Sequence, residues 1–273
     1  MTTCRIEIDG NICEMPELAQ GASGGGFAFG LYKAGSSLLY RTLRQLARNT
    51  SVGYFDVLHK FREAGAILET SRFSETGIAL LRSYVDRRGI VFGGWREFPT
   101  NYELPLRADT HTYLLIRDPR DMITSHYFSL KYSHLTTGLE AKYILPERER
   151  LQHVDIDAFA RSQASVVASY FSQYEALQGT RLLLRRYEDI ILDRMTFANE
   201  LCEHFGIDAP PAKRRAVVER NTVLPASEDV HAHVRQVTPG DHAKKLSPAT
   251  IEFLNAELAD VLRKYDYKSH IAG

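Results

Sequence analysis

A lysine, a glycine and two serines lie between an apolar run and a helix-like segment near the start of the chain. Residues 27–31 are apolar or glycine, and their number suits a buried strand. Lys33, Gly35, Ser36 and Ser37 follow, and leucines then recur at helical spacing. A helix N-terminus carries unpaired N–H groups and attracts anions, and glycine lets the backbone approach them closely. The stretch predicts an anion site; the alternative is a small, polar turn without a ligand.

This loop differs from the nucleotide-binding sequence Gly-x4-Gly-Lys-Ser/Thr. Gly30 and Gly35 have the required separation, and Ser37 occupies the position of the metal-binding hydroxyl. Ser36, however, stands at the lysine position, and Lys33 precedes the second glycine by two residues. A P-loop kinase or other NTPase is therefore a weaker alternative than a site for a different phosphate-containing ligand.

A second pair of anion-binding residues follows the apolar run at 112–116. Arg117 comes directly after this run, and Ser125 lies about two helical turns further on. An arginine fork and a hydroxyl can together hold a phosphate dianion. Pro119 and Asp121 are typical of a helix start. The alternative is a local ion pair between Arg117 and Asp118.

Both stretches resemble the cofactor motifs of sulfotransferases that use 3′-phosphoadenosine 5′-phosphosulfate (PAPS). The 5′-phosphosulfate loop of that family reads Pro-Lys-Ser-Gly-Thr-Thr-Trp, and residues 32–38 keep its lysine, glycine and both hydroxyls, with Leu38 in place of the tryptophan. The family's 3′-phosphate motif reads Arg-Asn-Pro-Lys-Asp-x-x-x-Ser. Residues 117–125 match it at the arginine, the proline, a basic residue, the aspartate and the serine. The resemblance spans residues 27–253.

Two further segments take their interpretation from the resemblance. Tyr187, with the two acidic residues after it, is similar to a Tyr-Glu-Asp segment whose tyrosine lies near adenine in the family. Without the resemblance, it would be a strand end and a solvated acidic turn. Residues 235–244 are similar to the loop Arg-Lys-Gly-x-x-Gly-Asp-Trp-Lys, which closes over the 3′-phosphate and adenine. Gln236 and Val237 replace Lys-Gly in this chain, and His242 replaces the tryptophan.

The resemblance thus implies a set of PAPS-binding residues. They are Lys33, Ala34, Gly35, Ser36, Ser37, Leu38, Arg117, Ser125, Tyr187, Arg235, Gln236 and Val237.

Glu97 is predicted to be the catalytic base. Residues 95–99 leave a strand predicted at 90–94, at the edge of the sheet where ligands bind. Cytosolic sulfotransferases place a catalytic histidine in His-Leu-Pro at a similar point, and Glu97 would overlay it; other sulfotransferases use glutamate. Lys33 is predicted to be the second catalytic residue, because it can stabilise charge on the leaving phosphate. Asp56 and His59 are rival bases, and Glu97 as a solvated loop carboxylate is the alternative.

Composition limits the function classes. The 273 residues contain 34 Lys+Arg and 34 Asp+Glu, so the net charge of zero argues against a general nucleic-acid or anionic-membrane binder. The three cysteines, Cys4, Cys13 and Cys202, suggest no disulfide or zinc framework and favour a reducing compartment. No histidine has metal-ligand spacing. The chain shows no signal-peptide pattern and no run of ~18 apolar residues, so we expect a soluble, cytoplasmic protein without a metal.

The predicted fold class is α/β, a three-layer αβα architecture with a mostly parallel central sheet, as in the P-loop-NTPase-like sulfotransferases. Buried strands are expected at 27–31, 90–94, 112–116 and 181–184, with an edge strand at 4–8. Helices are expected at 57–64, 78–85, 156–177, 193–205 and 247–265, and after Pro119 and Pro210. Residues 133–155 and 221–246 are expected to be irregular, the first of them mobile. Residues 1–26 are predicted to be an N-terminal extension with a Gly-rich link, and residues 27–273 a single sulfotransferase domain.

The resemblance therefore implies a PAPS-dependent sulfotransferase. The expected acceptor is a hydroxyl or amine on a small molecule, a carbohydrate or a lipid precursor, and no nucleic acid or integral membrane segment is expected. The alternatives are a P-loop kinase or NTPase, and a nucleotide-binding module without turnover. The sequence fixes neither the acceptor nor the oligomeric state.

Overall fold

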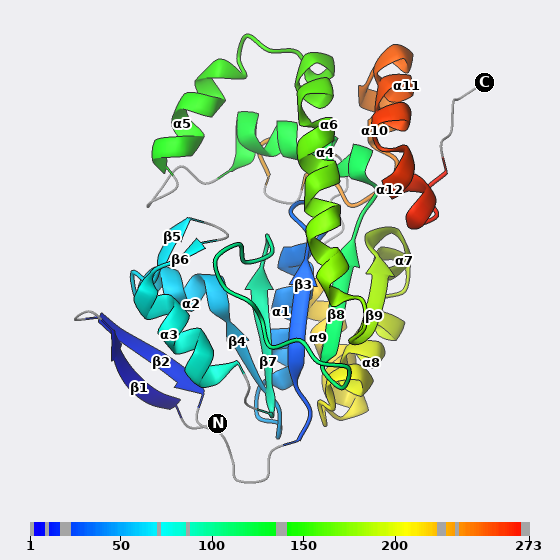
Figure 1. Cartoon of the computed structure of the whole chain (residues 1–273). Coiled ribbons are helices and arrows are strands. Elements are labelled where there is room, and N and C mark those ends of the chain that lie inside the picture. The colour runs from blue at the N-terminus through cyan, green and yellow to red at the C-terminus, as the bar shows by residue number, and fades with distance from the viewer. Residues whose placement is uncertain are drawn as a thin grey trace. The chain divides into compact units, whose positions relative to one another are not determined.

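The computed structural model describes residues 3–8, 11–16, 23–69, 72–85, 88–134, 141–222, 228–232 and 235–268 (Figure 1). The chain divides into two compact units. Unit 1 comprises residues 1–116 and 174–222, and unit 2 comprises residues 117–173 and 223–273. The single domain proposed for residues 27–273 stays a prediction.

A five-stranded parallel sheet forms the framework of unit 1 (Figure 1). Its strand order is β4-β7-β3-β8-β9. The strands are β3 (Gly26–Gly30), β4 (Gly53–Asp56), β7 (Ile90–Trp95), β8 (His111–Ile116) and β9 (Arg181–Arg186). Four of the five were predicted; β4 was not, because it is short and ends in an aspartate. The parallel arrangement confirms the predicted fold class.

The prediction that β9 is buried is wrong. Every residue of β7 is buried, whereas Arg181 in β9 is exposed and the other residues of that strand are half-buried. The reason is position, because β9 is an edge strand and pairs only with β8. Arginines at both ends of the strand suit this partly solvated edge.

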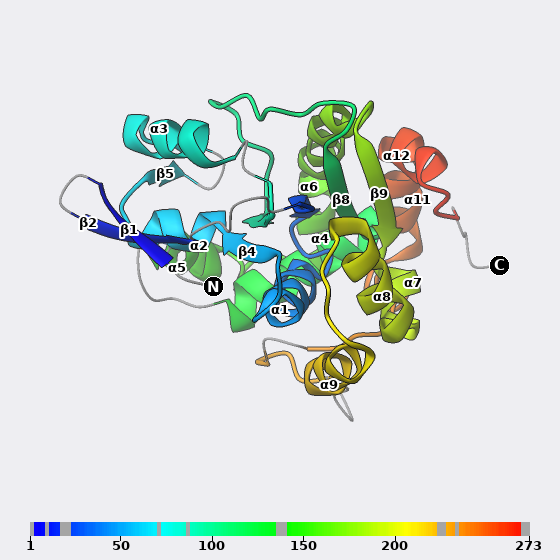
Figure 2. The same ribbon diagram turned by 90° about the horizontal axis from the view of Figure 1, so that it is seen from below.

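Helices of unit 1 cover the sheet through apolar side chains. On one face, Ala28, Tyr113 and Leu115 pack with Leu43 of α1 (Ser36–Ala47) and Leu201 of α8 (Arg194–Phe205). Figure 2 shows α8 and α9 (Pro211–Asn221) grouped with α1.

Aromatic side chains dominate the opposite face. The rings of Phe29 and Trp95 lie 5.9 Å apart, and Phe73 of β6 (Arg72–Phe73) packs edge-on against both Trp95 and Phe61 of α2 (Val57–Glu63). The remaining elements of unit 1 are β5 (Ile67–Glu69), α3 (Glu75–Tyr84), the 3₁₀ helix η3 (Tyr174–Leu177) and α7 (Tyr187–Leu192).

The N-terminal segment forms a separate hairpin. β1 (Thr3–Ile8) pairs antiparallel with β2 (Asn11–Pro16), and neither strand joins the large sheet. Residues 4–8 were therefore predicted correctly as a strand, but β2 was missed. Arg5 and Glu14 face each other across the pair at 3.8 Å, and both are largely exposed, so their ion pair adds little stability.

The regular elements in the described part of unit 2 are all helices. They are α4 (Pro119–Phe128), the π-helical turn η1 (Ser129–Ser133), α5 (Ala141–Arg150), α6 (Ile156–Gln173), α10 (His242–Lys245), α11 (Pro248–Glu257) and α12 (Ala259–Lys264). The single helices predicted at 156–177 and 247–265 are each interrupted, the first after Gln173 and the second at Leu258.

The prediction that residues 133–155 are irregular is wrong at α5. This helix buries none of its residues, so the sequence carries no apolar periodicity there. Polar contacts hold it instead. Arg148 donates hydrogen bonds to the carbonyl groups of Leu130 and His134, and Arg150 pairs with Glu147 at 2.6 Å.

Helix starts agree with the capping residues in the sequence. Asp56 accepts a hydrogen bond from the backbone N–H of His59 at the start of α2, and Asp193 does the same from Thr196 at the start of α8. In unit 2, Asp118 caps α4, whose first residue is Pro119.

Candidate functional site

The loop between β3 and α1 has the geometry of an anion site. Gly35 precedes the helix with φ 87°, in the left-handed region, and α1 has no side-chain hydrogen bond capping its N-terminus. The N–H groups of the first turn are therefore not satisfied by a capping side chain. Lys33 also has a positive φ, of 62°, a conformation that non-glycine residues adopt at some energetic cost.

Tyr187 packs against this loop. A Cβ atom built on Gly35 would lie 2.6 Å from Cδ2 of the Tyr187 ring, so only glycine leaves room for the tyrosine. Tyr187 is buried and begins α7, directly after β9. The structure thus brings together two parts of the predicted cofactor site that are about 150 residues apart in sequence.

Arg96 contacts the loop and was missed as a site residue. One of its terminal nitrogens, Nη1, donates a hydrogen bond to the hydroxyl of Ser36, the first residue of α1. Arg96 follows β7 and is half-buried. Its position beside the predicted base, at the carboxyl end of a strand, could have marked Arg96 as a site residue. Its contact with Ser36 could not be predicted from the sequence.

Tyr40 links the ends of the two strands that flank this region. Its hydroxyl accepts a hydrogen bond from the N–H of Gly30 at 2.9 Å and donates one to the carbonyl of Trp95. Burial raises the pKa of Tyr40 well above its usual value, and the nearby charge of Arg96 only partly offsets this. The neutral hydroxyl therefore holds the ends of β3 and β7 in place.

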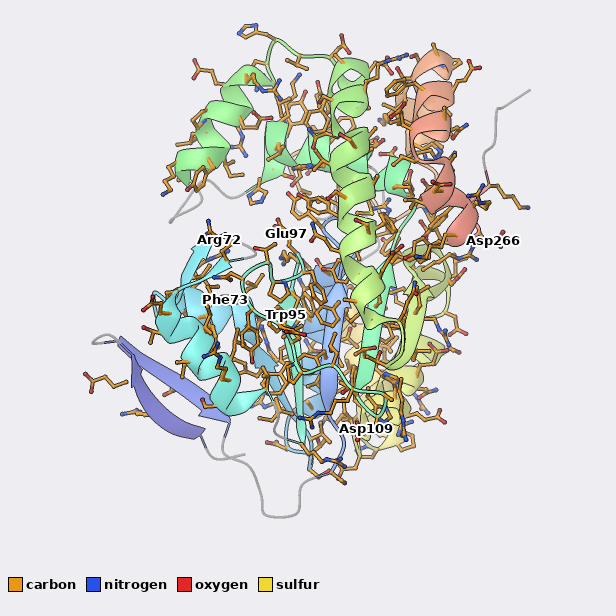
Figure 3. The ribbon with its side chains drawn as sticks, in the orientation of Figure 1. Arg72, Phe73, Trp95, Glu97, Asp109 and Asp266 are labelled. Carbon is orange, nitrogen blue, oxygen red and sulfur yellow. The ribbon has the colours of Figure 1, made fainter. Side chains whose placement is uncertain are left out.

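Glu97 lies on the loop that leaves β7, as predicted, and is half-buried. Figure 3 shows it beyond Trp95, the last residue of the strand. Aromatic residues anchor the chain on either side. Trp95 is fully buried and donates its indole N–H to the carbonyl of Phe92, and the Phe98 ring stacks on Phe29 with centroids 5.7 Å apart.

The two rival bases make contacts that suit structural roles. The Asp56 carboxylate accepts a hydrogen bond from Arg44 at 2.8 Å, and it caps α2 by accepting one from the N–H of His59 at 3.1 Å. The His59 side chain is 59% exposed and lies 3.3 Å from Glu63 on the same helix.

Unit 2 contains the second predicted anion cluster. Asp121 of α4 is fully buried, and its carboxylate lies 3.3 Å from Arg117. It also accepts hydrogen bonds from the N–H groups of Gly240 and His242 at 2.7 and 2.9 Å. Burial alone would raise the pKa of Asp121, but the hydrogen bonds from His242 and the charge of Arg117 outweigh it and hold the pKa well below its usual range.

Arg235 lies in the same cluster and is buried. Its terminal nitrogens bind Asp241 and Glu228, and its guanidinium carbon lies 4.3 Å from the centre of the Phe128 ring. Phe128 is one helical turn after Ser125 on α4, so Arg235 contacts the face of α4 that carries Ser125. Gln236 and Val237 follow as half-buried residues in irregular structure.

Arg120 makes contacts in this region that suit a structural role. It forms a buried ion pair with Asp118 at 2.7 Å, and it donates further hydrogen bonds to Asn255 and to the carbonyl of Lys268. Asp118 thus pairs with Arg120, whereas Arg117 pairs with Asp121.

Within the described ranges, no group of three or more His, Cys, Asp or Glu side chains could hold a metal ion. Among the helices of the same ranges, none combines the length and the apolar character needed to cross a membrane.

The fold is that of solved sulfotransferase structures. Mouse sulfotransferase SULT7A1 complexed with PAP aligns with a TM-score of 0.60 and 12% identity, over 96% of this chain and 95% of that one. Retinol dehydratase in complex with retinol and PAP gives 0.56 and 13%, and the same protein with androsterone and inactive cofactor PAP gives 0.54 and 13%. Both alignments cover 96% of this chain and 90% of the other. No protein-family model and no curated protein sequence matches the chain.

Proposed function

We propose that this protein is a sulfotransferase that transfers the sulfuryl group of PAPS to a hydroxyl or amine acceptor. The observation that carries the proposal is the loop of residues 32–38. It combines the left-handed Gly35, a helix N-terminus without a side-chain cap, Tyr187 against the glycine and Arg96 on Ser36. The sulfotransferase fold supports the same assignment.

In unit 1, the loop binds the 5′-phosphosulfate. The N–H groups of the first turn of α1, the hydroxyls of Ser36 and Ser37 and the charge of Lys33 suit its oxygen atoms. Arg96 adds a second cation beside Ser36. Adenine lies near Tyr187 and Leu38.

In unit 2, Arg117, Ser125 and Arg235 bind the 3′-phosphate. Arg117 and Arg235 are both buried, which strengthens charge-assisted hydrogen bonds relative to those in water. Gln236 and Val237 contribute backbone contacts beside Arg235.

Glu97 acts as general base in the transfer. The acceptor oxygen forms a bond to sulfur as the bond from sulfur to the bridging phosphate oxygen breaks, and that electron pair stays on the 5′-phosphate. The acceptor proton passes to the Glu97 carboxylate. Lys33 stabilises charge on the leaving phosphate, and Arg96 stabilises charge on the sulfuryl group during its transfer. The products are a sulfate ester, or a sulfamate from an amine, and 3′-phosphoadenosine 5′-phosphate (PAP).

We propose a small-molecule acceptor, with a carbohydrate or lipid precursor as the specific class, and a cytoplasmic location. The kinase or NTPase alternative is less favoured, because Ser36 stands at the lysine position of a P-loop and contacts Arg96 instead. A binding module without turnover would keep nucleotide affinity and lack a base.

An acceptor screen with labelled PAPS tests this function. Small alcohols, phenols, sugars and lipid precursors are incubated with the protein, and label transfer is measured. Label in any acceptor, lost in the Lys33→Ala variant, supports the proposal. Magnesium-dependent ATP hydrolysis without transfer from PAPS would support the NTPase instead.

A further inference from the structure

One buried carboxylate connects the two segments of unit 2 that carry the candidate 3′-phosphate residues. Asp121 lies on α4, midway between Arg117 and Ser125. Its oxygens accept hydrogen bonds from the N–H groups of Gly240 and His242, shortly after Arg235 in the chain. The Asp121 side chain is 0% exposed, so water does not compete for these bonds.

His242 adds a side-chain contact to this connection. Its Nδ1 atom lies 2.7 Å from Oδ1 of Asp121, while Nη2 of Arg117 lies 3.3 Å from Oδ2. The neighbouring residue, Asp241, binds the guanidinium of Arg235. Both candidate phosphate-binding arginines are therefore held by adjoining parts of one hydrogen-bonded network.

The charged side chains of this cluster balance one another. Three cations, Arg117, Arg235 and Lys245, are matched by three carboxylates, Asp121, Asp241 and Glu228. A guanidinium has five N–H donors, and the carboxylates that hold Arg235 do not use all of them. The direction of the remaining donors depends on how Asp121 and Asp241 hold each arginine.

We propose that Asp121 and His242 are positioning residues for recognition of the 3′-phosphate. They orient Arg117 and Arg235 without contacting the nucleotide. The inference rests on the proposed function. The resemblance assigns no role to either residue, and His242 stands where the family's loop has tryptophan.

The test uses the full chain and measures affinity for PAP and for adenosine 5′-phosphate, which lacks the 3′-phosphate. His242→Phe removes the Nδ1 contact but keeps the Asp121 charge. His242→Asn can keep a donor near the place of Nδ1. Asp121→Asn removes the charge. Asp260→Asn serves as a control, because Asp260 is 90% exposed on α12.

His242→Phe and Asp121→Asn should reduce the preference for PAP over adenosine 5′-phosphate by about tenfold or more, as expected when charge-assisted hydrogen bonds lose their alignment. Affinity for adenosine 5′-phosphate should stay the same. His242→Asn should recover most of the preference, and Asp260→Asn should leave it unchanged. Thermal melting identifies a variant that fails to fold, and if Asp121→Asn does so, the histidine pair decides.

The inference is overturned if a folded His242→Phe protein keeps the wild-type preference. It is also overturned if both affinities fall equally, because that would indicate a structural role without 3′-phosphate selectivity. A wild-type protein that shows no preference for PAP would refute the cofactor assignment itself. The wild-type measurement alone reveals this outcome, so it is distinct from a failure of the present inference.

Discussion

Glu97 is the residue on which proton transfer depends in the proposed reaction. Glu97→Gln keeps the size and polarity of the side chain but removes its basicity. We expect turnover to fall by about 10²–10⁴-fold with unchanged PAP affinity. The measurement is single-turnover transfer from labelled PAPS, with Glu252→Gln on the exposed side of α11 as the control. Near-full turnover of Glu97→Gln would point to another base, and His59→Ala would then be the next variant.

Arg96 should act on the transferred group. Because PAP lacks the sulfuryl group, a residue that stabilises charge developing around the transferred sulfur should matter more for rate than for PAP binding. Arg96→Ala should lower the transfer rate by about 10²-fold or more while PAP affinity changes only a few-fold. The control is Arg82→Ala, an exposed position on α3. Equal losses in rate and in PAP affinity would give Arg96 a binding role instead.

Candidate site residues could be predicted from the sequence more readily than the contacts between their side chains. Lys33 and Gly35 were predicted from the pattern of the loop and Tyr187 from the family resemblance, and the structure places Tyr187 against Gly35. Arg96 and Asp121 were not identified as site residues. Their proposed roles rest on contacts with Ser36 and His242, which lie 60 and 121 positions away in the chain. Such contacts depend on how elements pack, and local spacing does not encode this.

At the scale of elements, the turn into α1 can be tested by two glycine variants. Gly35 and Gly179 both have left-handed φ values, 87° and 94°, so alanine strains the backbone at either position. A Cβ on Gly179 would meet nothing within 4 Å, whereas one on Gly35 would meet Tyr187 at 2.6 Å. Gly179→Ala should therefore lower the free energy of unfolding by roughly 1 kcal/mol without affecting PAP binding.

Gly35→Ala should lower the free energy of unfolding by more than Gly179→Ala, and it should also weaken PAP binding. Urea unfolding and calorimetric titration measure the two effects. If both variants lose the same stability and both keep full PAP affinity, the contact between Gly35 and the Tyr187 ring is not needed for stability or for PAP binding.

The predictable elements were those with apolar periodicity or a capping residue. α2 and α8 begin at aspartate caps, and β3, β7 and β8 are apolar runs. α5 has neither signal, because it buries none of its residues. Arg148 instead binds the carbonyl of Leu130, and Glu147 pairs with Arg150 within the helix. β4 was missed because a four-residue strand leaves little pattern to read.

At the scale of the whole molecule, stability should depend on pH through a half-buried histidine pair. Burial lowers the pKa of His204 to about 4, and the neighbouring His111, whose ring centroid lies 5.0 Å away, adds to the effect. The unfolded value is about 6.5. Because the folded pKa is depressed, the neutral form is favoured by folding. Its contribution is fully present above pH 6.5 and is lost as the pH falls toward 4.

The free energy of unfolding should accordingly decline between pH 6.5 and 4, and His204→Gln should flatten that decline. Urea titrations at several pH values measure it. The paired carboxylates Asp121 and Glu228 have lowered pKa values, so their contributions are lost in a more acidic range. An identical decline in His204→Gln would assign the pH dependence to other groups.

The fold class was predictable because strands and helices alternate along the chain. This pattern is visible even though the sequence identity to the solved sulfotransferases is only 12–13%. The division into two units was not predicted. It depends on packing between segments distant in sequence, since each unit is built from two separate stretches of chain.

Ligand binding should stabilise the whole molecule in proportion to its affinity for the folded state. PAP at about 100 times its dissociation constant should add ~2.7 kcal/mol to the free energy of unfolding. For a chain of this size, such a change raises the melting temperature by several degrees. Adenosine 5′-phosphate at the same concentration should give a smaller shift, because it cannot engage Arg117 and Arg235 through a 3′-phosphate. ATP with magnesium should also give less than PAP if the loop is not a P-loop. No shift with millimolar PAP would refute the cofactor assignment, and a larger shift with magnesium–ATP than with PAP would favour the NTPase.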